Sequence, residues 1–246
     1  MPKRLRLDLA LVERGLFPSR QQAQVAIMAG EVQIGGRTAA KASDLIRDED
    51  ELTVATRDRY VGRGGTKLEG ALTHFRIDAR DKVALDIGAS TGGFTDCLLQ
   101  IGARKVFAVD VGHGQLAWKI RDDPRVVTFE KLNARHLSRE QIPEPIEICV
   151  IDVSFISLTL ILPNAFELLT PDGVIVALIK PQFELAREDV GRGGIVRERE
   201  LHAKAQDKIV RFSETLGARV GGLFPSTITG TDGNQEFFIC LRKPSA

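Results

Sequence analysis

Four charged residues stand beside apolar segments in a pattern that points to chemistry. Lys67 precedes these segments, Asp152 lies at the end of "ICVIDV" as its next-to-last residue, Lys180 ends "VIVALIK" and Glu236 opens "EFFICL". If the segments are strands of a parallel sheet, Asp152 and Lys180 lie at the edge where such sheets bind ligands. A surface salt bridge is the ordinary explanation for any one of the four. The full set in this order favours a site with two ammonium and two carboxylate groups.

A glycine turn lies between the first of these residues and the rest. The stretch "VALDIGASTGGFTDCLLQIG", residues 83–102, has the pattern of a strand, a turn and a helix. Its G-x-x-x-G-G spacing differs from the G-x-G-x-x-G of dinucleotide enzymes. Asp86 would repel a pyrophosphate but suits the ammonium of an amino-acid ligand, and Asp110 ends the next strand, where a ribose-binding acid is expected. S-adenosylmethionine has both an amino-acid end and a ribosyl end; other nucleotides, or a merely tight turn, are the alternatives.

The contacts expected for such a methyl donor come from the turn and from the strand ends beyond it. Asn133 and Ala134 follow the third strand, where an adenine contact is expected. The predicted donor-binding residues are Asp86, Gly88, Ser90, Thr91, Gly92, Gly93, Phe94, Asp110, Asn133, Ala134 and Asp152.

The segments that must position these residues alternate between short apolar strands and helical stretches. From Lys82 onward the strands are "KVALDIG", "RKVFAVDV", "RVVTFEKL", "IEICVIDV" and "GVIVALIK", and "EFFICLRK" follows a long loop. This alternation predicts an α/β fold with a parallel sheet covered by helices.

The first 58 residues form a different pattern. "RLDLALVERGL" predicts one helix, and a second follows with Ser19 as N-cap, Gln22 completing the capping box and Gly30 after the last turn. "EVQIGGRTA" and "DELTVAT" predict short strands. Basic residues outnumber acidic ones up to Lys41, which predicts a basic face. We therefore divide the chain into a small module (1–58), a basic glycine-rich linker (59–66) and a large domain (67–246).

Composition limits the classes of protein to which this chain can belong. The 246 residues are 43% hydrophobic and carry a net charge of +1, as in ordinary globular proteins. The N-terminus returns to charge too quickly for a signal peptide, which favours the cytoplasm. The longest uncharged stretch, residues 153–166, is too short to span a membrane and predicts a buried helix. Three cysteines without a C-x-x-C pair predict reduced core thiols, and the four histidines show no ligand spacing, so we expect no metal.

One pentapeptide, "VGRGG", occurs twice, at residues 61–65 and 190–194. Several glycines beside an arginine suit a backbone nest for phosphate. Two mobile surface loops explain the composition equally well.

These motifs together resemble the TlyA family, bacterial ribosomal-RNA ribose methyltransferases sometimes called haemolysins. The resemblance rests on "RLRLDLALVERGLFPSRQQAQ", "RYVGRGGTKL", "LDIGASTGGFTD", "IDVSFIS" and "LIKPQFE", which span nearly the whole chain. It implies an S4 RNA-binding domain with an α+β fold, followed by an FtsJ-like domain with a Rossmann-like class I methyltransferase sheet, mostly parallel with an antiparallel last strand. Thr91 departs from the proline usual at that position in the wider FtsJ group.

The resemblance also assigns roles to residues. Lys67, Asp152, Lys180 and Glu236 correspond to the Lys-Asp-Lys-Glu tetrad of ribose 2'-O-methyltransferases. Lys180 would stabilise a developing alkoxide, Asp152 would orient its ammonium, and Lys67 and Glu236 would position the sugar. The implied partner is ribosomal RNA within ribosomal subunits, with cytidine as the implied nucleoside and S-adenosylmethionine as the cofactor. The residues expected to contact RNA phosphates are Arg4, Arg6, Arg20, Lys41, Arg59 and Arg63.

Three other functions fit the sequence less well. A membrane-active cytolysin would need a spanning or strongly amphipathic exposed segment, which the sequence does not show. An RNA-binding or ribosome-assembly protein with an inactive methyltransferase-like domain would have lost tetrad or donor-site residues. A nicotinamide oxidoreductase disagrees with the glycine spacing.

Overall fold

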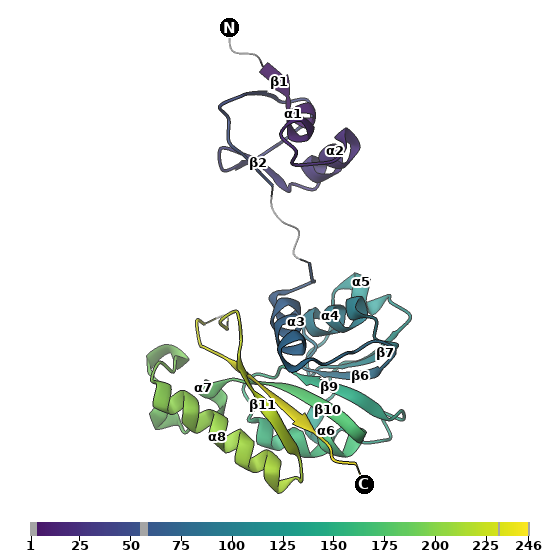
Figure 1. The fold of residues 1–246 in the computed structure, drawn as a ribbon, viewed down its shortest axis with the longest axis vertical. Helices are drawn as coiled ribbons and strands as arrows, with labels where there is room; N and C mark the ends of the chain where they lie inside the picture. Colours follow the sequence, from purple (N-terminus) through teal and green to yellow (C-terminus); the bar gives the residue numbers. More distant parts are fainter. Residues whose placement is uncertain (1–3, 55–58, 231, 246) are drawn as a thin grey trace. The chain divides into compact units, whose positions relative to one another are not determined.

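The computed structural model describes residues 4–54, 59–230 and 232–245, and the chain divides into two compact units, Met1–Asp58 and Arg59–Ala246 (Figure 1). The segment predicted as a linker, residues 59–66, falls in the second unit, and a helix starts inside it at Arg63. Tyr60 is buried there, so this segment packs with the large unit.

Within its described residues, 4–54, the first unit has two short helices and five short strands. In chain order they are β1 (Arg4–Arg6), α1 (Leu7–Glu13), α2 (Arg20–Met28), β2 (Val32–Ile34), β3 (Arg37–Thr38), β4 (Leu45–Arg47) and β5 (Leu52–Val54). β1 pairs with β4, and β2 lies between β3 and β5, all antiparallel. Ser19 caps α2 by accepting a hydrogen bond from the Gln22 backbone N–H, as its sequence predicts. Leu7, Leu11 and Ile27 bury their side chains in a core of its own.

The second unit is built on one seven-stranded sheet of order β11-β12-β10-β9-β6-β7-β8. Its strands are β6 (Val83–Ile87), β7 (Lys105–Val109), β8 (Val126–Phe129), β9 (Ile146–Ile151), β10 (Leu169–Ile179), β11 (Arg219–Pro225) and β12 (Phe237–Arg242). The strands from β10 to β8 run parallel, whereas β12 runs antiparallel to both of its neighbours. The predicted mostly parallel sheet with an antiparallel last strand is confirmed.

Helices cover both faces of this sheet (Figure 1). α3 (Arg63–Phe75), α4 (Gly93–Ile101) and α5 (Trp118–Arg121) contribute to one core, and α6 (Leu162–Leu168) and α8 (Arg199–Thr215) contribute to the other. Side chains of β6 alternate between the two cores: Leu85 and Ile87 face α6 and α8, whereas Ala84 faces α3 and α4. Buried on both faces, the central strands are almost wholly apolar, as parallel sheets require. The short α7 (Pro181–Glu184) follows β10.

The buried helix predicted over residues 153–166 is wrong for its first part. Residues 153–157 form a loop, a 3-10 turn covers Leu158–Leu160, and α6 begins only at Leu162, with Pro163 in its first turn. Phe155 has a φ of +64°, outside the range of a right-handed helix. Loop conformation here places polar and aromatic side chains at the sheet edge.

The predicted core thiols are confirmed. Cys97, Cys149 and Cys240 are free and buried. Burial raises the pKa of the Cys97 thiol to about 12, so this sulfur stays protonated at neutral pH.

Candidate functional site

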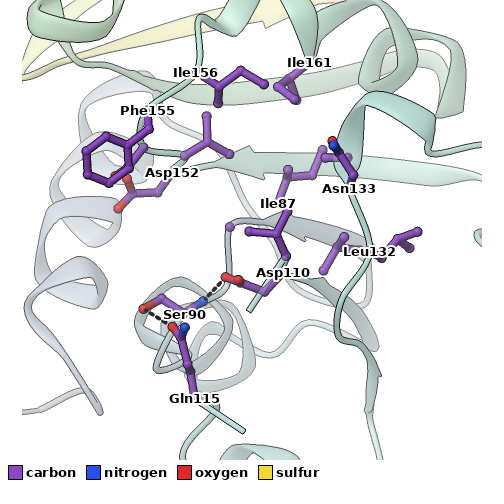
Figure 2. Close-up of a pocket in the computed structure, with 16 residues that line it drawn as sticks. Ile87, Ser90, Asp110, Gln115, Leu132, Asn133, Asp152, Phe155, Ile156 and Ile161 are labelled. Carbon is purple, nitrogen blue, oxygen red and sulfur yellow. Dashed lines mark hydrogen bonds between the residues drawn. The ribbon is translucent and has the colours of Figure 1, made fainter. Parts of the chain in front are cut away.

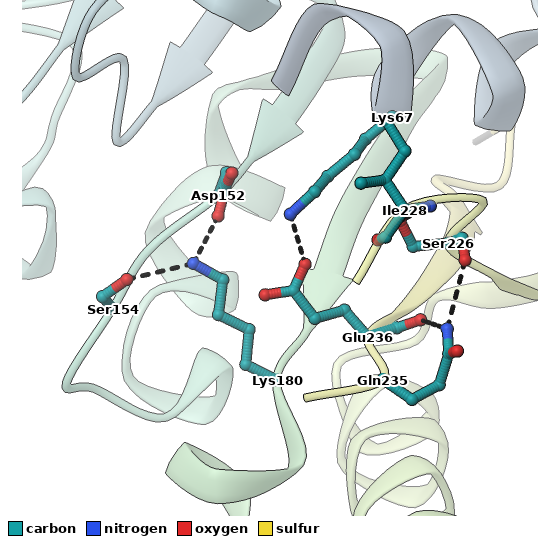
Figure 3. A network of polar contacts seen from close by, with 8 residues as sticks. All are labelled: Lys67, Asp152, Ser154, Lys180, Ser226, Ile228, Gln235 and Glu236. Carbon is teal, nitrogen blue, oxygen red and sulfur yellow. Dashed lines mark hydrogen bonds and ion pairs between the residues drawn. The ribbon is translucent and has the colours of Figure 1, made fainter. Parts of the chain in front are cut away.

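Two lysine–carboxylate pairs meet at the carboxyl edge of the sheet (Figure 3). Lys180 Nζ lies 2.6 Å from Asp152 Oδ1 and donates a hydrogen bond to Ser154 Oγ at 3.0 Å. Lys67 Nζ donates to Glu236 Oε2 at 2.5 Å. The structure therefore brings the four predicted tetrad residues together, although they come from four separate segments.

Strand register explains this convergence. Ile179 of β10 pairs with Phe237 of the antiparallel β12, so Lys180 leaves the sheet where Glu236 enters it. β9 runs parallel to β10 and ends one residue before Asp152, at the same edge. Lys67 reaches the edge from α3, with only 7% of its surface exposed.

The glycine turn is pressed against the backbone of Asp152. Gly88 has a φ of +87°, and a Cβ atom there would overlap the carbonyl oxygen of Asp152. The Asp152 N–H donates to the Ile87 carbonyl at 2.9 Å. Glycine at position 88 is thus required both by its conformation and by its neighbour.

Beside the turn opens a cavity of about 340 Å³ (Figure 2). Its apolar lining includes Ile87, Leu132 and Ile161, and its polar lining includes Ser90 and Gln115. Of the predicted donor-binding residues, the cavity is lined by Gly88, Ser90, Asp110, Asn133, Ala134 and Asp152. An apolar slot with a few fixed polar groups is the usual form of a cofactor site.

Asp110 is held in place by the backbone around it. Its Oδ2 accepts from the Ser90 N–H at 2.8 Å and its Oδ1 from the Gly112 N–H at 2.6 Å. Each carboxylate oxygen has a second lone pair, so both can still accept from ligand hydroxyls. Across the cavity, Asn133 caps a short 3-10 turn by accepting from the Arg135 N–H at 3.0 Å.

Asp86 lies beneath the turn and lines neither this cavity nor the smaller one next to it. Its Oδ2 accepts from Thr95 Oγ1 at 2.6 Å, while its buried Oδ1 has no hydrogen-bond partner within the described residues. Burial, reinforced by the Asp152 charge, raises the pKa of the Asp86 carboxyl to about 7. The folded state keeps this proton at pH values where the unfolded chain releases it, so folding stability falls as pH rises through about 4 to 7.

A second cavity of about 130 Å³ lies between the glycine turn and the start of α3. Three more predicted residues, Thr91, Gly93 and Phe94, line it, together with Arg63 of the first "VGRGG" segment. Gly92 lines neither cavity, because it faces Leu116 and Ile120 behind the turn. A Cβ atom on Gly93 would lie 3.0 Å from the Gly65 nitrogen, so the first "VGRGG" segment packs against the turn.

In the first unit, two of the predicted RNA-binding arginines hold a buried acid. Arg6 donates to both oxygens of Asp8, and Arg20 Nε donates to Asp8 Oδ2 at 2.9 Å. Arg6 holds the pKa of the Asp8 carboxyl well below its usual range, with help from Gln24 and Arg20. Both guanidiniums remain about half exposed, at 41% and 51%, so they also face solvent. Arg4 and Lys41 are exposed on the same unit.

The other two predicted RNA-binding residues belong to the second unit. Arg59 pairs with Glu69 and lies over the Tyr60 ring, 5.2 Å from its centroid. Arg63 starts α3 and is exposed.

Sequence reasoning missed three residues at this edge: Ser154, Phe155 and Gln115. Ser154 bonds the Lys180 ammonium, and Phe155 lines the larger cavity with 91% of its surface exposed. Gln115 lines the same cavity beside Ser90. Ser154 and Phe155 could have been found from their position directly after the segment that ends near Asp152, since residues that follow a strand lie at the same edge of the sheet.

No group of three or more His, Cys, Asp or Glu side chains suited to a metal occurs among residues 4–54, 59–230 and 232–245. In the same described parts of the chain, no helix is both long and apolar enough to cross a membrane.

The fold is that of S-adenosylmethionine-dependent methyltransferases. A solved enzyme of this class from Mesorhizobium loti matches 74% of this chain and all of its own chain, with a TM-score of 0.55 at 14% identity. The model of FtsJ-like methyltransferases matches residues 60–243, and that of the S4 domain matches residues 5–52. A solved structure from Streptococcus thermophilus is 44% identical, with a TM-score of 0.76 over all of this chain and 90% of that one.

Curated relatives narrow the family. The 16S/23S rRNA (cytidine-2'-O)-methyltransferase TlyA of Mycobacterium tuberculosis is 46% identical over 98% of this chain and 91% of its own length. A protein named Hemolysin A, from Brachyspira hyodysenteriae, is 43% identical over 95% of this chain and 98% of its own length. The chain therefore belongs to the TlyA family of FtsJ-like methyltransferases with an S4 domain. The resemblance stated from the sequence is confirmed.

Proposed function

We propose that this protein transfers a methyl group from S-adenosylmethionine to the 2'-hydroxyl of a ribose in ribosomal RNA, with cytidine as the nucleoside. The observation that supports this most directly is the Lys180–Asp152 pair at the mouth of the donor cavity. A ribosomal substrate also places its action in the cytoplasm.

The cavity residues fit the proposed donor. The apolar side chains of Ile87, Leu132 and Ile161 suit an adenine ring, and the Asp110 carboxylate suits ribose hydroxyls. Asp86 lies under the turn with an unpartnered oxygen and a raised pKa, and the cationic amino-acid end of a bound donor nearby would favour its ionised form. S-adenosylmethionine, when bound, supplies an electrophilic methyl group.

Lys180 would act on the ribose oxygen. An ammonium has three N–H donors; one bonds Ser154 Oγ, and the Asp152 carboxylate lies 2.6 Å from the nitrogen as an ion pair. An N–H not engaged by Ser154 would stabilise negative charge on the 2'-oxygen as it bonds to the methyl carbon in line. The carbon–sulfur bond would break to release S-adenosylhomocysteine, and the hydroxyl proton would pass to solvent. Lys67 and Glu236 neutralise each other beside this group and would position the sugar by fixing the shape of this edge of the sheet.

Phe155 provides a surface for the target base. Its ring is exposed at the cavity, 5.1 Å between centroids from the ring of Phe183. A positive φ at a bulky residue costs energy and persists where its surroundings hold it. Stacking on such a ring stabilises a base that leaves its helix to reach an active site.

The first unit would add affinity for structured RNA. Exposed Arg4 and Lys41, and the half-exposed Arg6 and Arg20, would contact phosphates. In the second unit, Arg59 and Arg63 would also contact phosphates. We propose the division into a binding module (1–58), a connecting segment (59–66) and a catalytic domain (67–246) on this basis.

The test is methylation of ribosomal subunits that lack the modification, with isotope-labelled S-adenosylmethionine and purified protein. A methylated 2'-oxygen can no longer attack the neighbouring phosphodiester, so the modified position should resist alkaline cleavage. Label on a base, or no label despite donor binding, would contradict ribose methylation. Donor binding without transfer would instead favour an inactive RNA-binding protein.

A further inference from the structure

The segment that carries Ser154 and Phe155 is fastened to the segment that follows Lys180. Ser154 Oγ accepts from Lys180 Nζ, and the ring of Phe155 lies against that of Phe183. Farther along, both Ser157 and Leu158 bond to Glu184. These contacts run in the same order along residues 154–158 and 180–184, so the two segments lie along each other.

Glu184 is the buried charged residue among the contacts between residues 154–158 and 180–184. Its side chain is 1% exposed, although it belongs to a four-residue helix at the edge of the domain. Oε2 accepts from Ser157 Oγ at 2.5 Å and Oε1 accepts from the Leu158 N–H at 2.8 Å. A buried carboxylate is costly unless such donors satisfy it, so this arrangement serves a definite conformation.

Lys208 of α8 completes the network. Its Nζ donates to Glu184 Oε2 at 3.1 Å and to the Glu184 carbonyl at 2.6 Å, and it reaches Ser157 Oγ at 3.3 Å. The loop after Asp152 is thereby fixed to a 17-residue helix packed on the sheet. Apart from this network, the Lys180–Ser154 bond and the Phe155–Phe183 contact also link residues 153–157 to the segment after β10.

We propose that Glu184 is a positioning residue that holds residues 153–158 in the conformation that presents Ser154 to Lys180 and Phe155 to the target base. It touches neither donor nor ribose; it acts through the loop. This inference rests on the proposed function for its effect on the reaction, but not for its effect on the loop. A misplacement of about 1 Å at a reacting group costs about 10²-fold in rate.

The first test measures the loop itself. In Glu184→Gln, one oxygen that accepts a hydrogen bond becomes an amide nitrogen facing Ser157, Leu158 or Lys208. Hydrogen–deuterium exchange should become faster at the Leu158 amide and across residues 153–158, and stay unchanged across the glycine turn, residues 86–95. Unchanged exchange at Leu158 would overturn the proposal, whatever the protein's activity.

The second test measures the reaction. Glu184→Gln should lower kcat about 10- to 100-fold, with donor affinity within twofold of wild type. Ser157→Ala, a milder change, should lower kcat less, and the double variant should lose less than the product of the two losses because both act through one network. Glu188→Gln, an exposed acid four residues away, is the matched control and should behave as wild type.

Rates are expressed per donor-binding site, so partial unfolding does not imitate the effect. Faster exchange with an unchanged kcat would overturn the catalytic part of the proposal. If the wild-type protein methylates no ribose, the proposed function fails and that part fails with it, while the exchange experiment still decides whether Glu184 holds the loop.

Discussion

The two lysine–carboxylate pairs of the site contain the same chemical groups in different surroundings. The Lys67–Glu236 pair is enclosed, with side chains 9% and 4% exposed, and Lys67 Nζ contacts only that carboxylate within the described residues. Lys180 and Asp152 are 12% and 23% exposed, and Lys180 also bonds Ser154. Asp152 lines both cavities, whereas Lys67 and Glu236 line neither.

This difference separates two tasks. In the enclosed Lys67–Glu236 pair, each charge is neutralised by the other. This pair therefore fixes the local structure and produces little electrostatic field at the cavities. A pair at the cavity mouth keeps one N–H for a ligand. We therefore expect the enclosed pair to matter most for stability and the open pair to matter most for rate.

Removing one member of the enclosed pair should have the largest effect. Lys67→Met leaves the Glu236 carboxylate buried without its cation, and unfolding free energy should fall by about 3–5 kcal/mol. The double variant Lys67→Met with Glu236→Leu should recover most of that loss, because no charge remains buried, yet methylation should stay low. Denaturant unfolding of the three proteins measures this; a single variant as stable as wild type would contradict the comparison.

Lys180→Ala should cost about 10²–10³-fold in kcat, the usual cost of removing one donor aimed at developing negative charge. Donor affinity and fold should be nearly unchanged. Single-turnover methylation together with donor titration measures both. The chain has a single tryptophan, Trp118, and the Ala117 N–H bonds the Thr91 carbonyl of the glycine turn at 3.0 Å, so its fluorescence can report donor binding. An equal loss of donor affinity would mean that Lys180 serves the donor instead.

Asp110→Ala tests donor binding independently of the two lysine–carboxylate pairs. Losing hydrogen bonds to a charged group should weaken donor binding by about 1–3 kcal/mol. The rate at saturating donor should change little, because the hydrogen bonds of Asp110 go to the Ser90 and Gly112 backbone and not to either lysine–carboxylate pair (Figure 2). Isothermal calorimetry checks the affinity; an unchanged value would remove Asp110 from the donor site.

Ser154→Ala should have the smallest effect. It removes the hydrogen bond from Lys180 and leaves the ion pair with Asp152 in place, so kcat should fall by about 3- to 10-fold, the range of one solvent-exposed hydrogen bond of about 1 kcal/mol. Stability should be unchanged, since Ser154 is exposed. Ser245→Ala, another exposed serine with one side-chain hydrogen bond, far along the chain, is a suitable control.

Much of the fold and part of the site could be predicted from the sequence. Strand-ending Asp152 and Lys180 and the spacing of Gly88, Gly92 and Gly93 are local signals, and register then brings distant positions to one edge. The loop after Asp152 could not be predicted, since its conformation depends on Glu184 and Lys208, which are far away in sequence. Its apolar residues therefore indicated a helix. Arg6 and Arg20 show a further limit, because charge alone did not reveal that they satisfy buried Asp8.

The contact between Gly88 and the Asp152 carbonyl has an effect on how this protein can change over time. With no space between them, the donor turn and the catalytic aspartate cannot drift apart by separate small steps. A side chain at position 88 would push the glycine turn and Asp152 apart, and would therefore shift the donor site and the ribose site together. A second substitution that restored only one of these sites could not compensate for it. In the proposed reaction, the alignment of the methyl carbon with the ribose oxygen thus depends on a single backbone contact and not on two sites that can vary independently.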